Sequence, residues 1–305
     1  MIKVGYLVSY DYELLINSLN TVYDESDQIF LAIDKKRRTW AGNRFEISDS
    51  FYKSIQQFDV KNKITFFEDD FYVPELSPME NEVRERNLLL KEMGRGWLIQ
   101  LDADEYACDF KSLAEQLRKK KYLLTFFKFL PVVLSGYQIN LFKKGEDGFF
   151  YVSNPTFFNF VTNFPRYTGA RKNQNFVNIN IGSVYLHQSY AREEEEIYQK
   201  FINWGHKNDF DTEKFFNFWK KISKDNYHSI KNFHPLQPDL WRSLSFTKAT
   251  SINELITNGQ FQEELNFSEL TVKRIFVENC KILYRRKKRT IKRMVVGLLR
   301  ILKLK

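Results

Sequence analysis

The sequence contains few of the residues that mark a disulfide-bonded or zinc-binding protein. Only two of its 305 residues are cysteines, Cys108 and Cys280, and they lie far apart without forming a CxxC pair. This spacing argues against both a disulfide framework and a cysteine-ligated zinc site. A reducing compartment fits best.

A secretion signal is also missing from the N-terminal sequence. MIKVGYLVSY is strand-like almost from its start and has no basic region, apolar core or small-residue cleavage site. We therefore expect a cytoplasmic enzyme or binding protein. Hydrophobic residues are abundant, with 43% of the chain hydrophobic and 16% aromatic, which is enough for a large core.

Basic residues are concentrated at one end of the chain. The formal net charge is +9, and residues 281–305 hold 11 Lys and Arg with no Asp or Glu. The rest of the chain is therefore close to neutral. Because no nucleic-acid-reading motif accompanies the basic cluster, we do not expect nucleic acid as a partner.

Residues 281–305 allow two interpretations. Ile291, Val295, Leu298 and Leu302 fall near one helical stripe, which is typical of a basic amphipathic helix on an anionic membrane surface. The apolar run is too short to span a bilayer. Alternatively, a terminal helix packs on the protein's own core and leaves a solvated basic edge. We expect peripheral attachment to the inner face of the cell membrane.

Strand and helix patterns alternate in the first third of the chain. Buried-strand patterns cover 3–10, 28–34, 63–67 and 97–101, and helical spacing covers 15–22 and 80–94. The second helix should end at Gly94. Repeated strand–helix–strand units predict an α/β fold with a mostly parallel sheet flanked by helices. Ligands of such sheets bind at the carboxyl ends of the strands.

After residue 120 the pattern changes to aromatic, strand-rich sequence. Turn residues at 135–136 and 146–148 favour hairpins, and a helical pattern begins near Glu193. No repeat or low-complexity linker divides the chain. We therefore predict a main α/β domain over 1–190, a helical C-terminal extension over 191–280, and the basic tail over 281–305.

Three carboxylates directly follow the last of the predicted parallel strands. In WLIQLDADEY, residues 97–106, Asp102 and Asp104 are two residues apart and point the same way on extended backbone, whereas Glu105 faces elsewhere. Paired carboxylates at a strand end predict a seat for Mg²⁺ or Mn²⁺ with open positions for phosphate oxygens. The alternative is that Asp102 or Asp104 caps a turn or a helix.

Three stretches of the sequence resemble the GT-A fold glycosyltransferases, in particular those similar to glycosyltransferase family 2. They are the opening strand, helix and strand over 3–34, the segment ERNLLLKEMGRGWLIQLDADEY, and the segment YLHQSYAREEEEIYQKFINWGH. The resemblance implies a Rossmann-like GT-A fold. Residues 1–190 would then form the nucleotide-sugar-binding and catalytic domain, and 191–280 would complete the acceptor side.

The resemblance also implies contacts to the nucleotide. Tyr10 and Asp11 would lie beside the base, and Asp34 would contact the base or the ribose. Arg86 and Asn87 would face the nucleotide or its diphosphate. The sequence DKKRRTWAG replaces the Ser-Thr-Asp cluster that family 2 often has after the second strand.

The metal ligands implied by the resemblance are Asp102, Asp104 and His187. Asp102 would approach both ribose and metal, Asp104 would bind the metal, and His187 would be a late ligand. An imidazole ligand favours Mn²⁺ over Mg²⁺. The alternative for His187 is a hydrogen-bonded structural histidine.

An inverting transferase needs a carboxylate that takes the proton of the acceptor hydroxyl. Asp147 resembles the Glu-Asp pair that supplies this base in parts of family 2, although an aspartate before Gly148 can equally be a turn residue. Glu105 and Glu193 are the other candidates.

The resemblance therefore implies a metal-dependent glycosyltransferase in surface polysaccharide synthesis. It would move a sugar from a nucleoside-diphosphate donor, a UDP-sugar, to a glycan or lipid-linked acceptor with inversion. A sugar-phosphate nucleotidyltransferase would need a glycine-rich phosphate loop, which VSYDYELL lacks. A phosphatase would need a further acidic pair downstream. A non-enzymatic membrane- or nucleic-acid-binding protein acting through its basic C-terminal tail is the remaining alternative.

Overall fold

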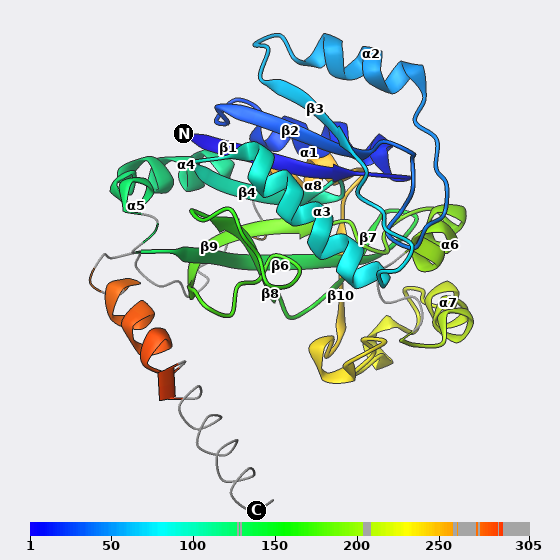
Figure 1. The fold of residues 1–305 in the computed structure, drawn as a ribbon. Helices are drawn as coiled ribbons and strands as arrows, with labels where there is room; N and C mark the ends of the chain where they lie inside the picture. The colour runs from blue at the N-terminus through cyan, green and yellow to red at the C-terminus, as the bar shows by residue number, and fades with distance from the viewer. Residues whose placement is uncertain are drawn as a thin grey trace, which may run out of the picture.

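Figure 1 shows the computed structural model, in which helices pack on both faces of one large mixed sheet. The structure describes residues 1–126, 128, 130–203, 209–258, 261, 273, 275–285 and 287–288. The predicted fold class, a Rossmann-like α/β sheet flanked by helices with further helices in the C-terminal region, is confirmed.

Parallel strands form the N-terminal half of the sheet. They are β1 (Ile2–Val8), β2 (Gln28–Asp34), β3 (Ile64–Asp69) and β4 (Trp97–Asp102), in the spatial order β4-β1-β2-β3. The chain runs outward from β1 to β3 and then crosses back, so that β4 pairs with the other side of β1. At such a reversal the carboxyl ends of the two central strands border a crevice in which ligands bind.

The helices between these strands lie on opposite faces of the sheet. The helices α1 (Leu15–Val22), α2 (Asp49–Phe58) and α4 (Phe110–Lys119) share one apolar cluster with Val4 and Ile99. The helix α3 (Pro78–Met93) packs with Leu7 and Leu98 on the other face. Because side chains alternate along a strand, β1 and β4 serve both clusters.

Local sequence fixes both ends of α3. The Ser77 hydroxyl accepts a hydrogen bond from the Glu80 backbone N–H, and the Glu80 carboxylate accepts one from the Ser77 N–H, with Pro78 at the first helical position. This capping box satisfies two N–H groups that the helix leaves unpaired. Gly94, at φ 68°, follows the last helical residue, as predicted.

The long strand β6 (Val132–Lys144) organises the second half of the sheet. It pairs antiparallel with β7 (Gly148–Val152) and β8 (Thr156–Thr162) and parallel with β9 (Val177–His187). The predicted hairpin turn near 146–148 is confirmed by the β6–β7 pair. The short strand β5 (Glu105–Ala107) pairs with β9, which brings His187 opposite Glu105.

The C-terminal region combines helices with one strand that returns to the sheet. The helices α6 (Glu194–Asn203) and α7 (Thr212–Lys220) enclose an aromatic cluster that includes Phe142 and Trp241. The strand β10 (Leu244–Lys248), which we did not predict, pairs antiparallel with β7. The remaining short elements are η1 (Tyr12–Leu14), α5 (Tyr122–Thr125), η2 (Tyr227–Ser229), η3 (Pro238–Leu240) and α8 (Ile252–Thr257).

A last described helix, over 275–285, extends away from the sheet (Figure 1). Ile275 is buried, and the Asn279 side chain donates to the Pro131 carbonyl at 3.0 Å. No helix within the described residues is long and apolar enough to cross a bilayer. The apolar stripe predicted from residue 291 onward lies outside the described residues, and the division of the chain into 1–190, 191–280 and 281–305 stays a prediction.

Candidate functional site

A cavity of about 490 Å³ lies at the carboxyl ends of β1, β2 and β4. The turns that follow the three strands line it: residues 9–11, 38–40 and 102–105. The cavity therefore occupies the point at which the strand order reverses. In α/β sheets this is the usual position of a ligand site.

The acidic residue at the end of β4 is bound by two arginines. Asp102 Oδ1 accepts from Arg86 Nη2 at 2.9 Å, and Asp102 Oδ2 accepts from Arg171 Nη2 at 3.0 Å. Burial disfavours the charged form, but Arg171 and Arg86 outweigh burial and lower the pKa of Asp102. Asp102 is therefore an ionised carboxylate inside a salt-bridge network.

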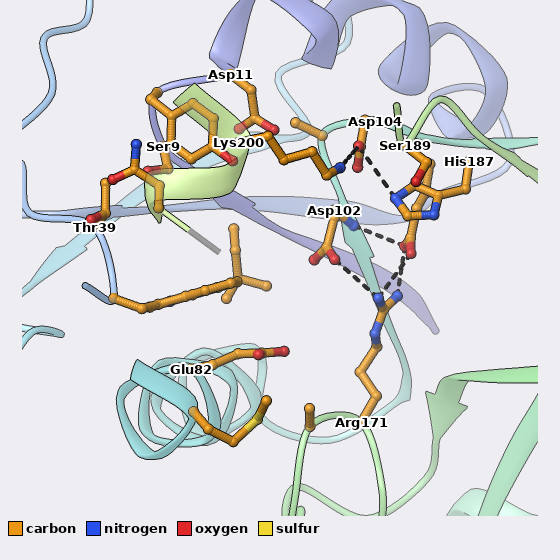
Figure 2. Close-up of a pocket in the computed structure, with 18 of the residues that line it drawn as sticks. Ser9, Asp11, Thr39, Glu82, Asp102, Asp104, Arg171, His187, Ser189 and Lys200 are labelled. Carbon is orange, nitrogen blue, oxygen red and sulfur yellow. Dashed lines mark hydrogen bonds and ion pairs between the residues drawn. The ribbon is translucent and has the colours of Figure 1, made fainter. Parts of the chain in front are cut away.

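Asp104 has more neighbouring cationic and imidazole groups than Asp102. Its Oδ2 accepts from Arg192, from Lys200 Nζ at 2.9 Å, and lies 3.3 Å from His187 Nε2 (Figure 2). Burial opposes ionisation, yet Lys200, His187 and Arg192 together hold the pKa of Asp104 well below its usual range. Asp104 is thus the centre of a buried charge cluster.

Glu105 shares Arg171 with Asp102 and has further partners of its own. Its two carboxylate oxygens accept from Arg171, and Oε1 also accepts from the Gln138 side-chain amide at 2.8 Å. Oε2 accepts from the Asp102 backbone N–H at 3.0 Å. Although Glu105 lines the cavity, both of its oxygens are occupied by donors of the protein.

The donor set around the acidic pair does not fit a divalent cation. Each carboxylate is paired with cations of the protein, and His187 Nδ1 is hydrogen-bonded to Asn140 Oδ1 at 2.9 Å. In the part of the chain that the structure describes, no three His, Cys, Asp or Glu side chains are placed to hold a metal. The structure brings together Asp102, Asp104 and His187, but their role as Mn²⁺ or Mg²⁺ ligands stays a prediction.

Three residues predicted beside the base or ribose line the same cavity. Tyr10 and Asp11 follow β1, and the Asp11 carboxylate accepts from Arg192 at 3.1 Å. Asp34 ends β2, but its oxygens accept four backbone N–H groups, at 2.9 to 3.1 Å. These hydrogen bonds show that Asp34 holds two loops in place, which leaves it little capacity to bind a ribose.

The predicted diphosphate residues Arg86 and Asn87 lie behind the cavity wall. Arg86 is 1% exposed and donates to Glu82 and Asp102, and Asn87 Nδ2 donates to the carbonyls of Val83 and Tyr167. Neither residue is part of the cavity lining. Arg86 therefore acts on the cavity through Asp102.

Two of the three predicted base candidates lie elsewhere on the molecule. Asp147 is an exposed turn residue paired with Lys224, and Glu193 is exposed and paired with Lys144. Neither lines the cavity. The structure therefore groups only Glu105, of the three, with the acidic pair.

Three of the four cations that pair with Asp102 and Asp104 were not predicted from the sequence; only Arg86 was. Arg192 and Lys200 lie in the segment singled out for His187, so a search for counter-charges to the buried carboxylates would have found them. Arg171 carries no sequence signal, because it reaches the site from the loop before β9. Arg171 and Ser189, both in the cavity lining, have positive φ of 50° and 44°, a backbone strain that clusters at functional sites.

Two hydroxyls in the cavity lining have no hydrogen-bond partner among the described residues. Thr39 is 4% exposed, and its Oγ1 is buried without a hydrogen bond; the same holds for Ser9 Oγ. Figure 2 shows both residues on the wall formed by the turns after β1 and β2. A buried hydroxyl without a partner is costly, and a ligand in the cavity would relieve this cost.

None of the protein-family models and none of the curated proteins compared with the sequence matches it. Solved structures with a related fold include S. aureus TarS 1–349 in complex with UDP, at 14% identity and TM-score 0.29, covering 48% of this chain and 38% of that chain. HddC from Yersinia pseudotuberculosis is 11% identical at TM-score 0.31, and the match covers 65% of this chain and 97% of that chain. Mannose-6-phosphate isomerase from Helicobacter pylori is 12% identical at TM-score 0.32, and the match covers 79% of this chain and 92% of that chain.

The chain spans less than half of the length of the TarS chains it matches. At these TM-scores the similarities carry no conclusion about activity, and the family 2 resemblance stays a prediction. The function must be argued from the cavity itself.

Proposed function

We propose that the protein is a glycosyltransferase that uses a nucleoside-diphosphate sugar. The observation that carries this proposal is the position and lining of the cavity. It lies at the carboxyl ends of β1, β2 and β4, where the strand order reverses, and it combines unpartnered hydroxyls with cationic side chains. The hydroxyl and ring groups of a nucleoside can form hydrogen bonds with the unpartnered hydroxyls. The negative charge of a diphosphate is attracted to the cationic side chains.

The charge cluster is suited to a leaving diphosphate. In the transfer, the acceptor oxygen bonds to the anomeric carbon while the bond from that carbon to the diphosphate oxygen breaks. The bonding electron pair remains on the diphosphate, and the acceptor proton passes to a base. Fixed positive charge at Lys200 stabilises the diphosphate in this step, because Asp104 holds this side chain in place before the ligand arrives.

The acceptor would enter from the C-terminal side of the cavity. Tyr190, Leu240 and Trp241 line this part, and Trp241 and Tyr190 belong to the aromatic cluster of the helical region. Aromatic faces suit the apolar C–H face of a sugar ring, whereas Asn140 and Thr156 offer hydrogen bonds. We therefore propose a glycan or lipid-linked acceptor, with a UDP-sugar as donor and inversion at the anomeric carbon.

We also propose that the enzyme binds to an anionic membrane surface on the cytoplasmic side. In the helix over 275–285, Phe276, Leu283 and Tyr284 expose 56%, 55% and 69% of their surface. Lys281 and Arg285 lie among them, and the sequence that follows is rich in basic residues. Exposed apolar side chains beside basic ones support interfacial binding.

Product analysis tests the transfer reaction. Purified full-length protein is incubated with UDP- and GDP-sugars and glycan acceptors, and released nucleotides are identified. Release of nucleoside diphosphate with a matching glycosylated acceptor supports the proposal. Formation of a nucleotide sugar and pyrophosphate from a nucleoside triphosphate and a sugar phosphate would instead identify a nucleotidyltransferase. Absence of any nucleotide binding and turnover contradicts the proposal and leaves the basic tail as the functional element.

Vesicle sedimentation tests the membrane part separately. The full chain should pellet with anionic vesicles and remain free with neutral ones. A chain ending at residue 274 serves as the comparison, with its fold checked by thermal unfolding. Equal retention of both chains on anionic vesicles would contradict the membrane assignment without affecting the transferase proposal.

A further inference from the structure

The acidic pair that predicted a metal site is already bonded to the protein's own cations. Asp102 and Asp104 receive two cationic partners each, all at hydrogen-bond distance. The partners are Arg86 and Arg171 for Asp102, and Arg192 and Lys200 for Asp104. A divalent cation would therefore have to compete with these cations for the carboxylates of the pair.

Geometry opposes a metal at Asp104 as well. A divalent ion lies about 2.1 Å from a carboxylate ligand oxygen. Because Lys200 Nζ is 2.9 Å from Oδ2 of Asp104, an ion on this oxygen would lie within about 5 Å of the ammonium group. Arg192 donates to the same oxygen. A metal on this oxygen would therefore be repelled by both cations.

Of the cations in the cluster, Lys200 is the one best placed to meet a ligand. Arg86 and Arg192 are outside the cavity lining, and the two terminal nitrogens of Arg171 are already bonded to Asp102 and Glu105. Lys200 lines the cavity, and its ammonium has three donors, of which Asp104 takes one. Figure 2 shows its side chain running from α6 past Asp11 to the Asp104 carboxylate, where the ammonium group ends.

A second observation indicates that the cavity holds a ligand. Thr39 is buried and lines the cavity, yet its hydroxyl has no hydrogen-bond partner in the part of the chain that the structure describes. The hydroxyl is thus independent of the charge cluster and available to a bound molecule. Lys200 and Thr39 lie on different walls of one cavity.

We propose that the diphosphate of the donor is bound without a metal ion, by the ammonium group of Lys200. Arg171 and Arg192 are positioning residues, since they hold Asp102 and Asp104 in place and leave Lys200 facing the cavity. This inference rests on the proposed function, because it presupposes a nucleoside diphosphate ligand. It differs from the metal-dependent form that the sequence resemblance implies.

Calorimetric titration of the full-length protein separates the two forms. UDP is titrated in EDTA and again with Mn²⁺ or Mg²⁺, with GDP and uridine as further probes. We expect UDP to bind with the same affinity in EDTA as with either metal. Lys200→Met should weaken UDP binding by about tenfold or more, since a charge-assisted hydrogen bond to phosphate is lost. Uridine binding should change little, because uridine has no phosphate.

Two further variants guard against a general loss of structure. Lys200→Arg keeps the positive charge and should retain most of the UDP affinity. Lys214→Met removes an exposed lysine of the neighbouring helix α7 and should leave binding unchanged. Thermal unfolding of each variant confirms that it is folded.

The results of these titrations distinguish a metal-free diphosphate site from a metal-dependent one. Binding of UDP only in the presence of Mn²⁺ or Mg²⁺ overturns the metal-free site and keeps the proposed function. Equal losses of UDP and uridine affinity in Lys200→Met overturn the assignment of Lys200 to the phosphates. Failure of UDP and GDP to bind under every condition overturns both this inference and the proposed function.

Discussion

The indole N–H of Trp40 donates a hydrogen bond to the carboxylate of Glu85, which joins the turn after β2 to the middle of α3. Both residues line the cavity, and Glu85 is only 6% exposed. Burial raises the pKa of Glu85 to about 8, although the hydrogen bond from Trp40 and the nearby Arg86 act in the opposite direction. Glu85 is therefore mostly protonated at neutral pH.

This raised pKa predicts a pH-dependent stability. In the unfolded chain Glu85 ionises near pH 4.3, whereas the folded protein keeps it protonated up to about pH 8. The contribution of Glu85 to the free energy of unfolding should therefore be fully present below the unfolded pKa and should be lost as pH rises towards 8, by up to about 1.4 kcal/mol per pH unit. Glu85→Gln should remove this slope.

Urea unfolding of wild type and Glu85→Gln between pH 4 and 9 measures the difference. The exposed Glu75→Gln is the matched control and should keep the wild-type slope. An unchanged slope in Glu85→Gln would show that Glu85 ionises normally in the folded protein.

The charge cluster predicts a large stability loss when its central carboxylate is removed. Asp104→Asn leaves Arg192 and Lys200 buried without their shared counter-charge. Breaking one side of a buried ion pair costs about 3–5 kcal/mol. Chemical denaturation measures this loss of stability. Nucleotide binding by Asp104→Asn should be measured at a temperature at which the variant is still folded.

Asp147→Asn is the control for Asp104→Asn. It breaks an exposed pair with Lys224, which solvent already screens, and should leave the denaturation midpoint unchanged. Similar midpoints for Asp104→Asn and wild type would argue that the cluster contributes no net stability.

A glycine on β6 predicts a close backbone contact behind the site. A Cβ atom at Gly136 would clash with the Ser183 carbonyl of β9 and lie 3.0 Å from the Phe160 ring. Gly136→Ala should therefore separate β6 from β9 and lower the melting temperature by several degrees. At Gly169, the nearest atom to such a Cβ lies at 4.0 Å. Gly169→Ala should melt like wild type, and equal melting of both variants would contradict the close packing.

The positions of the base candidates predict their effects on turnover. Asp147→Asn and Glu193→Gln change exposed residues outside the cavity, so both should retain wild-type sugar transfer. Glu105→Gln removes the charge that holds Arg171 beside Asp102 and should reduce transfer strongly. A large loss of kcat in Asp147→Asn, with unchanged nucleotide binding, would restore Asp147 as the candidate base.

Local patterns in the sequence were enough to predict the parallel half of the sheet. The apolar strands and the helix ending at Gly94 follow from spacing and capping, which are properties of neighbouring residues. The acidic pair at the end of β4 could also be predicted as part of a ligand site, because the carboxyl ends of the strands border the ligand site in such sheets. The strand β10 was missed, since its stability comes from pairing with β7 almost a hundred residues earlier.

The sequence by itself determined where the carboxylates lie; only the tertiary structure decided what they bind. Asp102 and Asp104 are two residues apart in the chain, whereas Arg171, Arg192 and Lys200 come from two loops and a helix more than 60 residues away. No local pattern specifies such contacts, because the cost of burying a carboxylate can be met by a metal or by a cation from any part of the chain. The pairing of β9 with β5, and the reach of Lys200 from α6 to Asp104, brought two of these segments to the end of β4.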